Sequence, residues 1–314
     1  MKQLSFGKYR ALQRASTADG FFTILAVDHQ DALKQPMRPD DPMSVTDEEM
    51  IRFKLDVVSV LGDAVSGVLL DPLFGAYQAI ATDTIKQGAL LMGLEKADYQ
   101  MNPLPLDVEI DPDWTVEKLR HIADGAKLFF YYNTFESDHA ARQQAVVRQL
   151  VADCKTHDIP LYAEPIAYGM SDAVDKRTLV IKAAQEMCDI GADVLKMEFP
   201  VNVKKETDKA VWLEACVEMT NAIDVPWALL SAGVSFEIFI QQLEVACQAG
   251  ASGFIVGRAL WGDVATMPET ERLHWLKTVG KKRLGLLNAI VGLHGTPWHS
   301  HFETPSVTTD TFRQ

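Results

Sequence analysis

The chain has 314 residues, of which 47% are hydrophobic and 23% are charged, and its formal net charge is −13. This composition is typical of a globular protein with a large core, and the negative charge argues against non-specific binding to nucleic acid or to an anionic membrane. No apolar run reaches the roughly 18 residues of a membrane span, and no apolar segment follows the basic residues near the start. We therefore expect no signal peptide and a cytoplasmic protein.

Short apolar runs alternate with longer amphipathic stretches along the chain. Eight runs are continuously apolar, as strands are when both faces of a sheet are covered. They span residues 21–28, 67–71, 89–94, 127–132, 160–165, 193–198, 226–232 and 253–257. Helical patterns separate most of them, most clearly at 139–157, 177–192, 208–223 and 235–251.

Eight strands with helical crossovers predict a single (β/α)8 barrel over residues 1–314, with a doubly wound open sheet as the alternative. We expect an N-terminal extension over about 1–18 and an irregular tail over about 294–314. The irregular stretch 98–114 is expected on the side of the active site, after the third strand. The sequence contains neither GxGxxG nor GxxxxGK[ST], so it supports neither a dinucleotide cofactor nor a P-loop.

In such a barrel, functional groups gather at the carboxyl ends of the strands. The candidate residues at or near the predicted strand ends are polar side chains and two glycines: Asp28, His29, Gln30, Asp71, Tyr131, Tyr132, Glu164, Lys196, Glu198, Ser231, Gly233, Gly257 and Arg258. Asp71 is explained equally well as a cap of the following helix. Glu198 is expected to support Lys196 or to fix a loop.

Lys196 lies within the apolar stretch 192–202, where an unpaired ammonium group would be costly. Burial and a second nearby cation lower the pKa of such a lysine and supply the neutral amine that attacks a ketone. The resulting iminium is an electron sink that allows a nearby carbon–carbon bond to break. Glu164 is the best candidate for the general acid/base. Lys127 begins the predicted strand 127–132. It is either a second lysine of the site or a solvated charge at the bottom of the barrel.

The last two strands end in turns that suit an anion. Ser231 and Gly233 precede a predicted helix start near Ser235, and Gly257 and Arg258 precede a second one. Glycines let the backbone approach an anion, and arginine adds a bidentate donor. We expect a phosphate site here, with tight helix–strand packing as the alternative explanation.

The segments that carry these residues resemble a known family. They are "LAVDHQDAL", "LLDPLFG", "LEKADY", "AKLFFYYN", "ADVLKMEFPVN", "LLSAGVS" and "VGRALW". In this order they resemble the class I tagatose-1,6-bisphosphate aldolase family, which is related to the sulfofructose-phosphate aldolases. The resemblance runs from about residue 18 to about 265 and implies a (β/α)8 barrel, metal-free chemistry and no cofactor.

The resemblance also implies roles for individual residues. Lys196 would be the Schiff-base lysine, Glu164 the general acid/base and Lys127 the second cation. Asp28 and Gln30 would contact substrate, and the phosphate would be held by Ser231, Gly233, Gly257 and Arg258. The chain reads Asp-His-Gln where the family has Asp-Gln directly, so His29 and Gln30 are alternatives for the role of the glutamine.

The expected activity is reversible cleavage of a ketose 1,6-bisphosphate, tagatose or fructose, to dihydroxyacetone phosphate and glyceraldehyde 3-phosphate. A sulfofructose 1-phosphate aldolase that releases sulfolactaldehyde is one alternative, and a non-catalytic sugar-phosphate-binding regulator is another. A metal-dependent aldolase is disfavoured, because only His29 among the eight histidines lies at a strand end. We expect a small-molecule sugar phosphate as the ligand and a homo-oligomer.

Overall fold

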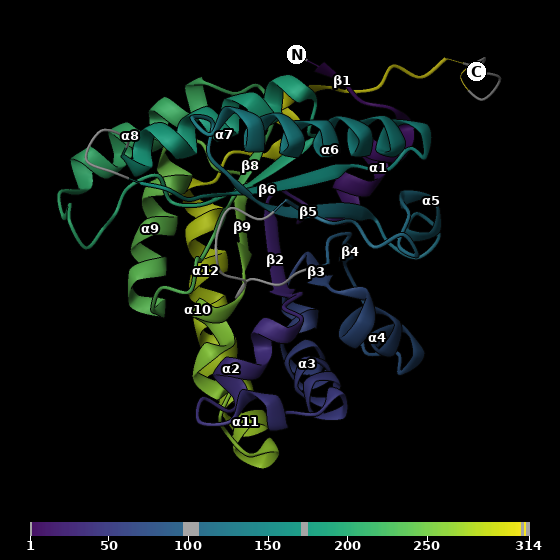
Figure 1. The fold of residues 1–314 in the computed structure, drawn as a ribbon, viewed down its shortest axis with the longest axis vertical. Helices are drawn as coiled ribbons and strands as arrows, with labels where there is room; N and C mark the ends of the chain where they lie inside the picture. The colour runs from purple at the N-terminus through teal and green to yellow at the C-terminus, as the bar shows by residue number, and fades with distance from the viewer. Residues whose placement is uncertain (1, 97–106, 171–174, 309–310, 312–314) are drawn as a thin grey trace.

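The structure is a computed structural model that describes residues 2–96, 107–170, 175–308 and 311. At its centre, eight parallel strands pair in chain order and close into a barrel (Figure 1). The strands are β2 (Phe22–Val27), β3 (Gly67–Leu70), β4 (Ala89–Gly93), β5 (Gly125–Tyr132), β6 (Leu161–Ala167), β7 (Val194–Met197), β8 (Trp227–Leu230) and β9 (Gly253–Val256). Every predicted run overlaps one of them, so the barrel is confirmed and the open sheet is wrong.

Helices surround the barrel (Figure 1). They are α2 (Lys34–Met37), α3 (Asp47–Leu61), α4 (Tyr77–Ala81), α5 (Val116–Leu119), α6 (Ser137–Thr156), α7 (Lys176–Ile190), α8 (Lys209–Asn221), α9 (Phe236–Gln248), α10 (Arg258–Trp261), α11 (Glu269–Trp275) and α12 (Lys281–His294). None of the helices described here has the length and apolar character needed to cross a membrane.

Local sequence signals set the helix ends next to the barrel strands. Thr46 and Glu49 form a reciprocal capping box at the start of α3. Asp175 caps α7 by accepting a hydrogen bond from the backbone N–H of Thr178. The same helix ends at Gly191, whose φ of 111° favours glycine, just before β7. The chain therefore turns sharply into the strand that carries Lys196.

The N-terminal extension is part of the fold. Helix α1 (Phe6–Arg14) is joined to the residue before β7 by a buried ion pair, in which Lys8 Nζ lies 2.8 Å from Asp193 Oδ2. Asp193 also accepts a hydrogen bond from the N–H of Leu161, the first residue of β6. These contacts fix α1 at the end of the barrel where the strands begin.

The C-terminal segment is more regular than expected. After α12, a short 3-10 helix (Trp298–His301) leads into β10 (Phe302–Glu303), which pairs in parallel with β1 (Lys2–Gln3). Trp298 is buried and packs edge-on against Tyr9 of α1. The tail from about 294 is therefore irregular only in part, because burial of Trp298 anchors it to the N-terminal helix.

The stretch 98–114 was predicted to be irregular and to lie beside the active site. Its residues 98–106 fall outside the described part of the chain. The remainder includes Ile110, which forms an antiparallel bridge with Glu95 directly after β4. The stretch therefore rejoins the barrel next to a buried carboxylate.

Candidate active site

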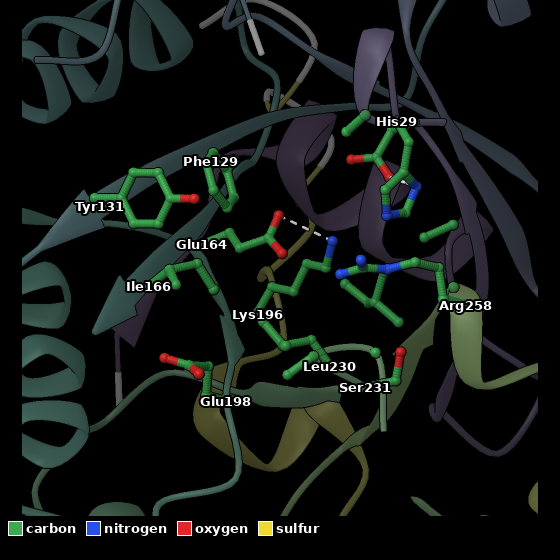
Figure 2. A pocket seen from close by; sticks show the side chains of 17 residues that line it. His29, Phe129, Tyr131, Glu164, Ile166, Lys196, Glu198, Leu230, Ser231 and Arg258 are labelled. Atoms are coloured by element: carbon green, nitrogen blue, oxygen red, sulfur yellow. Dashed lines mark hydrogen bonds and ion pairs between the residues drawn. The ribbon is translucent and has the colours of Figure 1, made fainter. Parts of the chain in front are cut away.

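A cavity of about 300 Å³ lies at the carboxyl ends of the barrel strands. Figure 2 shows Lys196 at its centre, with Glu164 on one side and Arg258 on the other. The structure brings most of the expected residues to its wall: Asp28, Glu164, Lys196, Ser231, Gly233, Gly257 and Arg258. Residues that are up to 230 positions apart therefore share one site.

Lys196 projects from β7 into this cavity and is only 5% exposed. Its register partner on β8 is Ala228, a small residue. The Nζ atom of Lys196 donates a hydrogen bond to Oε2 of Glu164, at 2.9 Å, from the neighbouring strand β6. This pairing offsets the free-energy cost of burying the Lys196 ammonium group, and it places a proton acceptor beside the amine.

Lys127 is fully buried, as the third residue of β5 rather than at the strand start. Its Nζ atom lies 2.8 Å from Asp28 Oδ2, 2.7 Å from Glu95 Oε1 and 2.9 Å from Glu164 Oε2. The alternative that Lys127 is a solvated charge at the bottom of the barrel is therefore wrong. Lys127 links three carboxylates behind the cavity.

The carboxylates of this cluster have opposite pKa shifts. Burial raises the pKa of Asp28, but the attraction of Lys127 and Lys196 outweighs it and holds that pKa well below its usual value. For Glu95, burial prevails over the attraction of Lys127, and the pKa is raised. Asp28 therefore stays ionised across the physiological pH range.

Glu95 is a member of the cluster that the sequence analysis did not single out. Its Oε1 accepts from Lys127, and its Oε2 accepts from the backbone N–H of Phe129 at 3.2 Å. A signal was present, because Glu95 stands just past the end of β4, as Asp28 and Asp71 do after β2 and β3.

The structure separates the two candidates for the role of the family glutamine. His29 lines the cavity, whereas the side-chain amide of Gln30 donates a hydrogen bond to the carbonyl of Glu95 at 3.2 Å and is not part of the cavity wall. The expectation that Gln30 contacts substrate is therefore not supported by its placement. Of the two residues, only His29 lines the cavity.

Two further carboxylates fix the surroundings of the cavity. Asp71 accepts from the N–H of Phe74 at 2.7 Å and pairs with the buried Lys54, so its capping role is confirmed. Glu198 accepts from the N–H of Ala167 at 2.8 Å and lies 3.2 Å from Lys176 Nζ. Glu198 therefore joins the last residue of β6 to the start of α7 and does not contact Lys196 through a hydrogen bond among the described residues.

The turns after β8 and β9 meet at one end of the cavity. Gly233 has a φ of 72°, and a Cβ atom placed there would lie 3.2 Å from Cζ of Arg258. Ser235 caps α9 through its hydroxyl group, which accepts from the N–H of Ile238. Arg258 itself is exposed, and within the described ranges no carboxylate pairs with it. An unpaired guanidinium beside a glycine turn is suited to bind a phosphate.

A buried lysine–glutamate pair at the carboxyl end of a (β/α)8 barrel indicates a barrel enzyme. The model of the DeoC/LacD family aldolases matches residues 22–263, and the chain belongs to this family. Tagatose 1,6-diphosphate aldolase 2 of Enterococcus faecalis is 32% identical and covers 96% of this chain and 98% of the relative. The tagatose 1,6-diphosphate aldolase of Lactococcus lactis is 32% identical, with coverages of 93% and 97%. The chain is therefore an aldolase, a lyase.

Solved structures share the fold. A Schiff-base-forming fructose-1,6-bisphosphate aldolase superimposes with a TM-score of 0.61 at 19% identity, over 90% of this chain and 98% of that one. The fructose-bisphosphate aldolase of Plasmodium falciparum gives a TM-score of 0.69 at 15% identity, over 94% and 98%. At such low identity these matches establish the barrel alone.

Proposed function

We propose that the protein is a class I aldolase that cleaves a ketose 1,6-bisphosphate through a Schiff base on Lys196. The observation that carries this proposal is the 2.9 Å pairing of Lys196 Nζ with Glu164 Oε2 inside the cavity. The named activity of the tagatose 1,6-diphosphate aldolase relatives supports the substrate class. The products are dihydroxyacetone phosphate and glyceraldehyde 3-phosphate.

The first half of the reaction forms the iminium. Glu164 takes a proton from the Lys196 ammonium across the 2.9 Å contact. The neutral amine attacks the C2 carbonyl, and Glu164 returns its proton to the hydroxyl group of the carbinolamine, which leaves as water and gives the iminium. Lys127 lies 2.8 Å from Asp28 and 2.9 Å from Glu164, and it holds both carboxylates in place.

The second half breaks the C3–C4 bond. Glu164 accepts the proton of the C4 hydroxyl, the aldehyde leaves, and the bonding electrons move to the iminium to give an enamine. Glu164 returns this proton to C3 of the enamine, and hydrolysis of the resulting iminium by water releases dihydroxyacetone phosphate and restores the amine. The phosphate of this half is held at the end of the cavity formed by Ser231, Gly233 and Arg258.

The test is trapping with borohydride. The protein is incubated with dihydroxyacetone phosphate and chelator, reduced, digested and analysed by mass spectrometry, with Lys196→Met as the control. An adduct on the peptide that contains Lys196 is expected in the unaltered protein alone. An adduct on Lys127 would show that Lys127 forms the Schiff base and that Lys196 is the second cation. Absence of any adduct with retained phosphate-ligand binding would favour a sugar-phosphate-binding regulator.

The aldehyde half is tested by turnover. Tagatose 1,6-bisphosphate, fructose 1,6-bisphosphate and sulfofructose 1-phosphate are supplied at equal concentration, and the released aldehyde is identified. We expect glyceraldehyde 3-phosphate from the bisphosphates at the higher kcat/KM. Preferential release of sulfolactaldehyde would be consistent with the same Schiff-base mechanism and would make sulfofructose 1-phosphate the preferred substrate.

A further inference from the structure

His29 occupies a position in the cavity that the proposed reaction leaves without a role. It follows Asp28 at the end of β2, and its side chain is 16% exposed and lines the cavity wall. Its Nδ1 atom lies 4.0 Å from Asp28 Oδ1. Figure 2 shows the imidazole on the same side of Lys196 as Arg258, away from Glu164.

The ring is held firmly. It packs edge-on against Trp261, with ring centroids 5.4 Å apart. Trp261 is fully buried, and its indole N–H donates to the carbonyl of Ala26 at 2.8 Å, two residues before Asp28. Trp261, in the helix that begins at Arg258 and hydrogen-bonded to β2, therefore helps to fix the orientation of the imidazole.

His29 also lies close to Gly257, the residue directly before Arg258. A Cβ atom on Gly257 would lie 3.3 Å from Cε1 of His29, and one on Gly233 would lie 3.2 Å from Cζ of Arg258. The absence of side chains at both glycines lets the backbone lie close to the imidazole and to the guanidinium. Both side chains and both glycines line the same cavity.

We infer that His29 completes the phosphate subsite by donating a hydrogen bond from its neutral imidazole to the phosphate of the dihydroxyacetone half. This inference rests on the proposed function, because that function places the phosphate at Arg258. It makes His29 a residue that positions and selects the phosphorylated substrate, rather than one that transfers protons at the reacting carbons.

The charges around His29 agree with this role. Burial lowers its pKa to about 3; Asp28 opposes this shift, while Arg258, Lys196 and Lys54 add to it. The imidazole is thus neutral at physiological pH, with one donor and one acceptor nitrogen. Donation to a charged group is worth roughly ten- to a hundredfold in affinity.

The experiment compares His29→Ala and His29→Gln with the unaltered protein, and His121→Ala serves as an exposed-histidine control. Binding of inorganic phosphate is measured by calorimetry, which needs no turnover. KM and kcat are measured in the condensation direction with dihydroxyacetone phosphate and with unphosphorylated dihydroxyacetone. The measurements are repeated between pH 6 and 8.

We expect His29→Ala to weaken phosphate binding and to raise KM for dihydroxyacetone phosphate by about tenfold or more. Its KM for dihydroxyacetone, its kcat and the shape of its pH profile should change little. His29→Gln, which keeps a neutral donor and guards against misfolding of the alanine variant, should recover most of the affinity. Unchanged phosphate affinity, or a loss of kcat with an altered pH profile, would overturn the inference even where the Lys196 adduct still forms.

Discussion

Lys127 and Lys196 reach the same atom, because the Nζ of each lies 2.9 Å from Oε2 of Glu164. One carboxylate oxygen therefore joins a fully buried lysine to the lysine that lines the cavity. The two cations are held close together by a shared anion. Any change to one of them therefore alters the surroundings of the other through Glu164.

Replacing Lys127 by methionine tests this coupling. The change leaves Asp28, Glu95 and Glu164 facing one another without their cation, so we expect a loss of about 3–5 kcal/mol in the free energy of unfolding. Trapping of dihydroxyacetone phosphate on Lys196 should also slow by at least about tenfold, because Glu164 is no longer oriented. Urea unfolding and the rate of borohydride trapping measure the two effects.

Lys54→Met is the matched control for that variant. Lys54 is fully buried and pairs with Asp71, but neither residue lines the cavity. This variant should lose comparable stability and retain trapping near the unaltered rate. Equal slowing in both variants would show that Lys127 acts through stability alone.

Replacing Glu164 by glutamine removes the proton acceptor and keeps the size of the side chain. We expect kcat to fall by about 10²- to 10⁴-fold, the usual contribution of a general acid/base. Glu198→Gln is the control, since Glu198 also lines the cavity but holds the N–H of Ala167 and Lys176. It should lose less than about tenfold. Similar losses in the two variants would argue against the assignment.

Gly233→Ala tests the closeness of the turn to Arg258. The positive φ of 72° and the 3.2 Å approach to Arg258 Cζ make a side chain strained there, at a cost of about 1–2 kcal/mol. We expect a higher KM for phosphorylated substrates with a smaller change in kcat. Gly285→Ala, in α12 where a Cβ meets nothing within 4 Å, should stabilise the protein by up to about 1 kcal/mol. An unchanged KM in Gly233→Ala would show that this turn does not contribute to phosphate binding.

The low pKa of His29 predicts a pH dependence of stability. Because its pKa is about 3 in the folded state against 6.5 for the unperturbed group, the unfolded chain binds more protons between these values. The contribution of His29 is therefore complete above pH 6.5 and is lost on acidification, by at most about 1.4 kcal/mol per pH unit. Unfolding by urea at pH 7, 6 and 5 should show a weaker pH dependence in His29→Gln. Identical curves would contradict the burial of a neutral imidazole.

Much of this molecule was predictable because its signals are local. Eight continuously apolar runs mark the strands, and strand-end positions marked Lys196, Glu164 and Arg258. Features that depend on pairing across the barrel were not predictable in this way. Nothing near Lys127 in the sequence shows that Asp28 and Glu95 neutralise it, and no periodicity shows that Gln30 turns towards the carbonyl of Glu95. The anchoring of Trp298 against Tyr9 likewise joins opposite ends of the chain.

The pairing of β1 with β10 has a consequence for synthesis on the ribosome. Lys2 and Gln3 are made about 300 residues before their partners Phe302 and Glu303. The barrel strands have all been translated well before β10 leaves the exit tunnel. Strands β1 and β10 can therefore pair only after the barrel strands have been made, so a nascent chain can close its barrel while the pairing of β1 with β10 is still open.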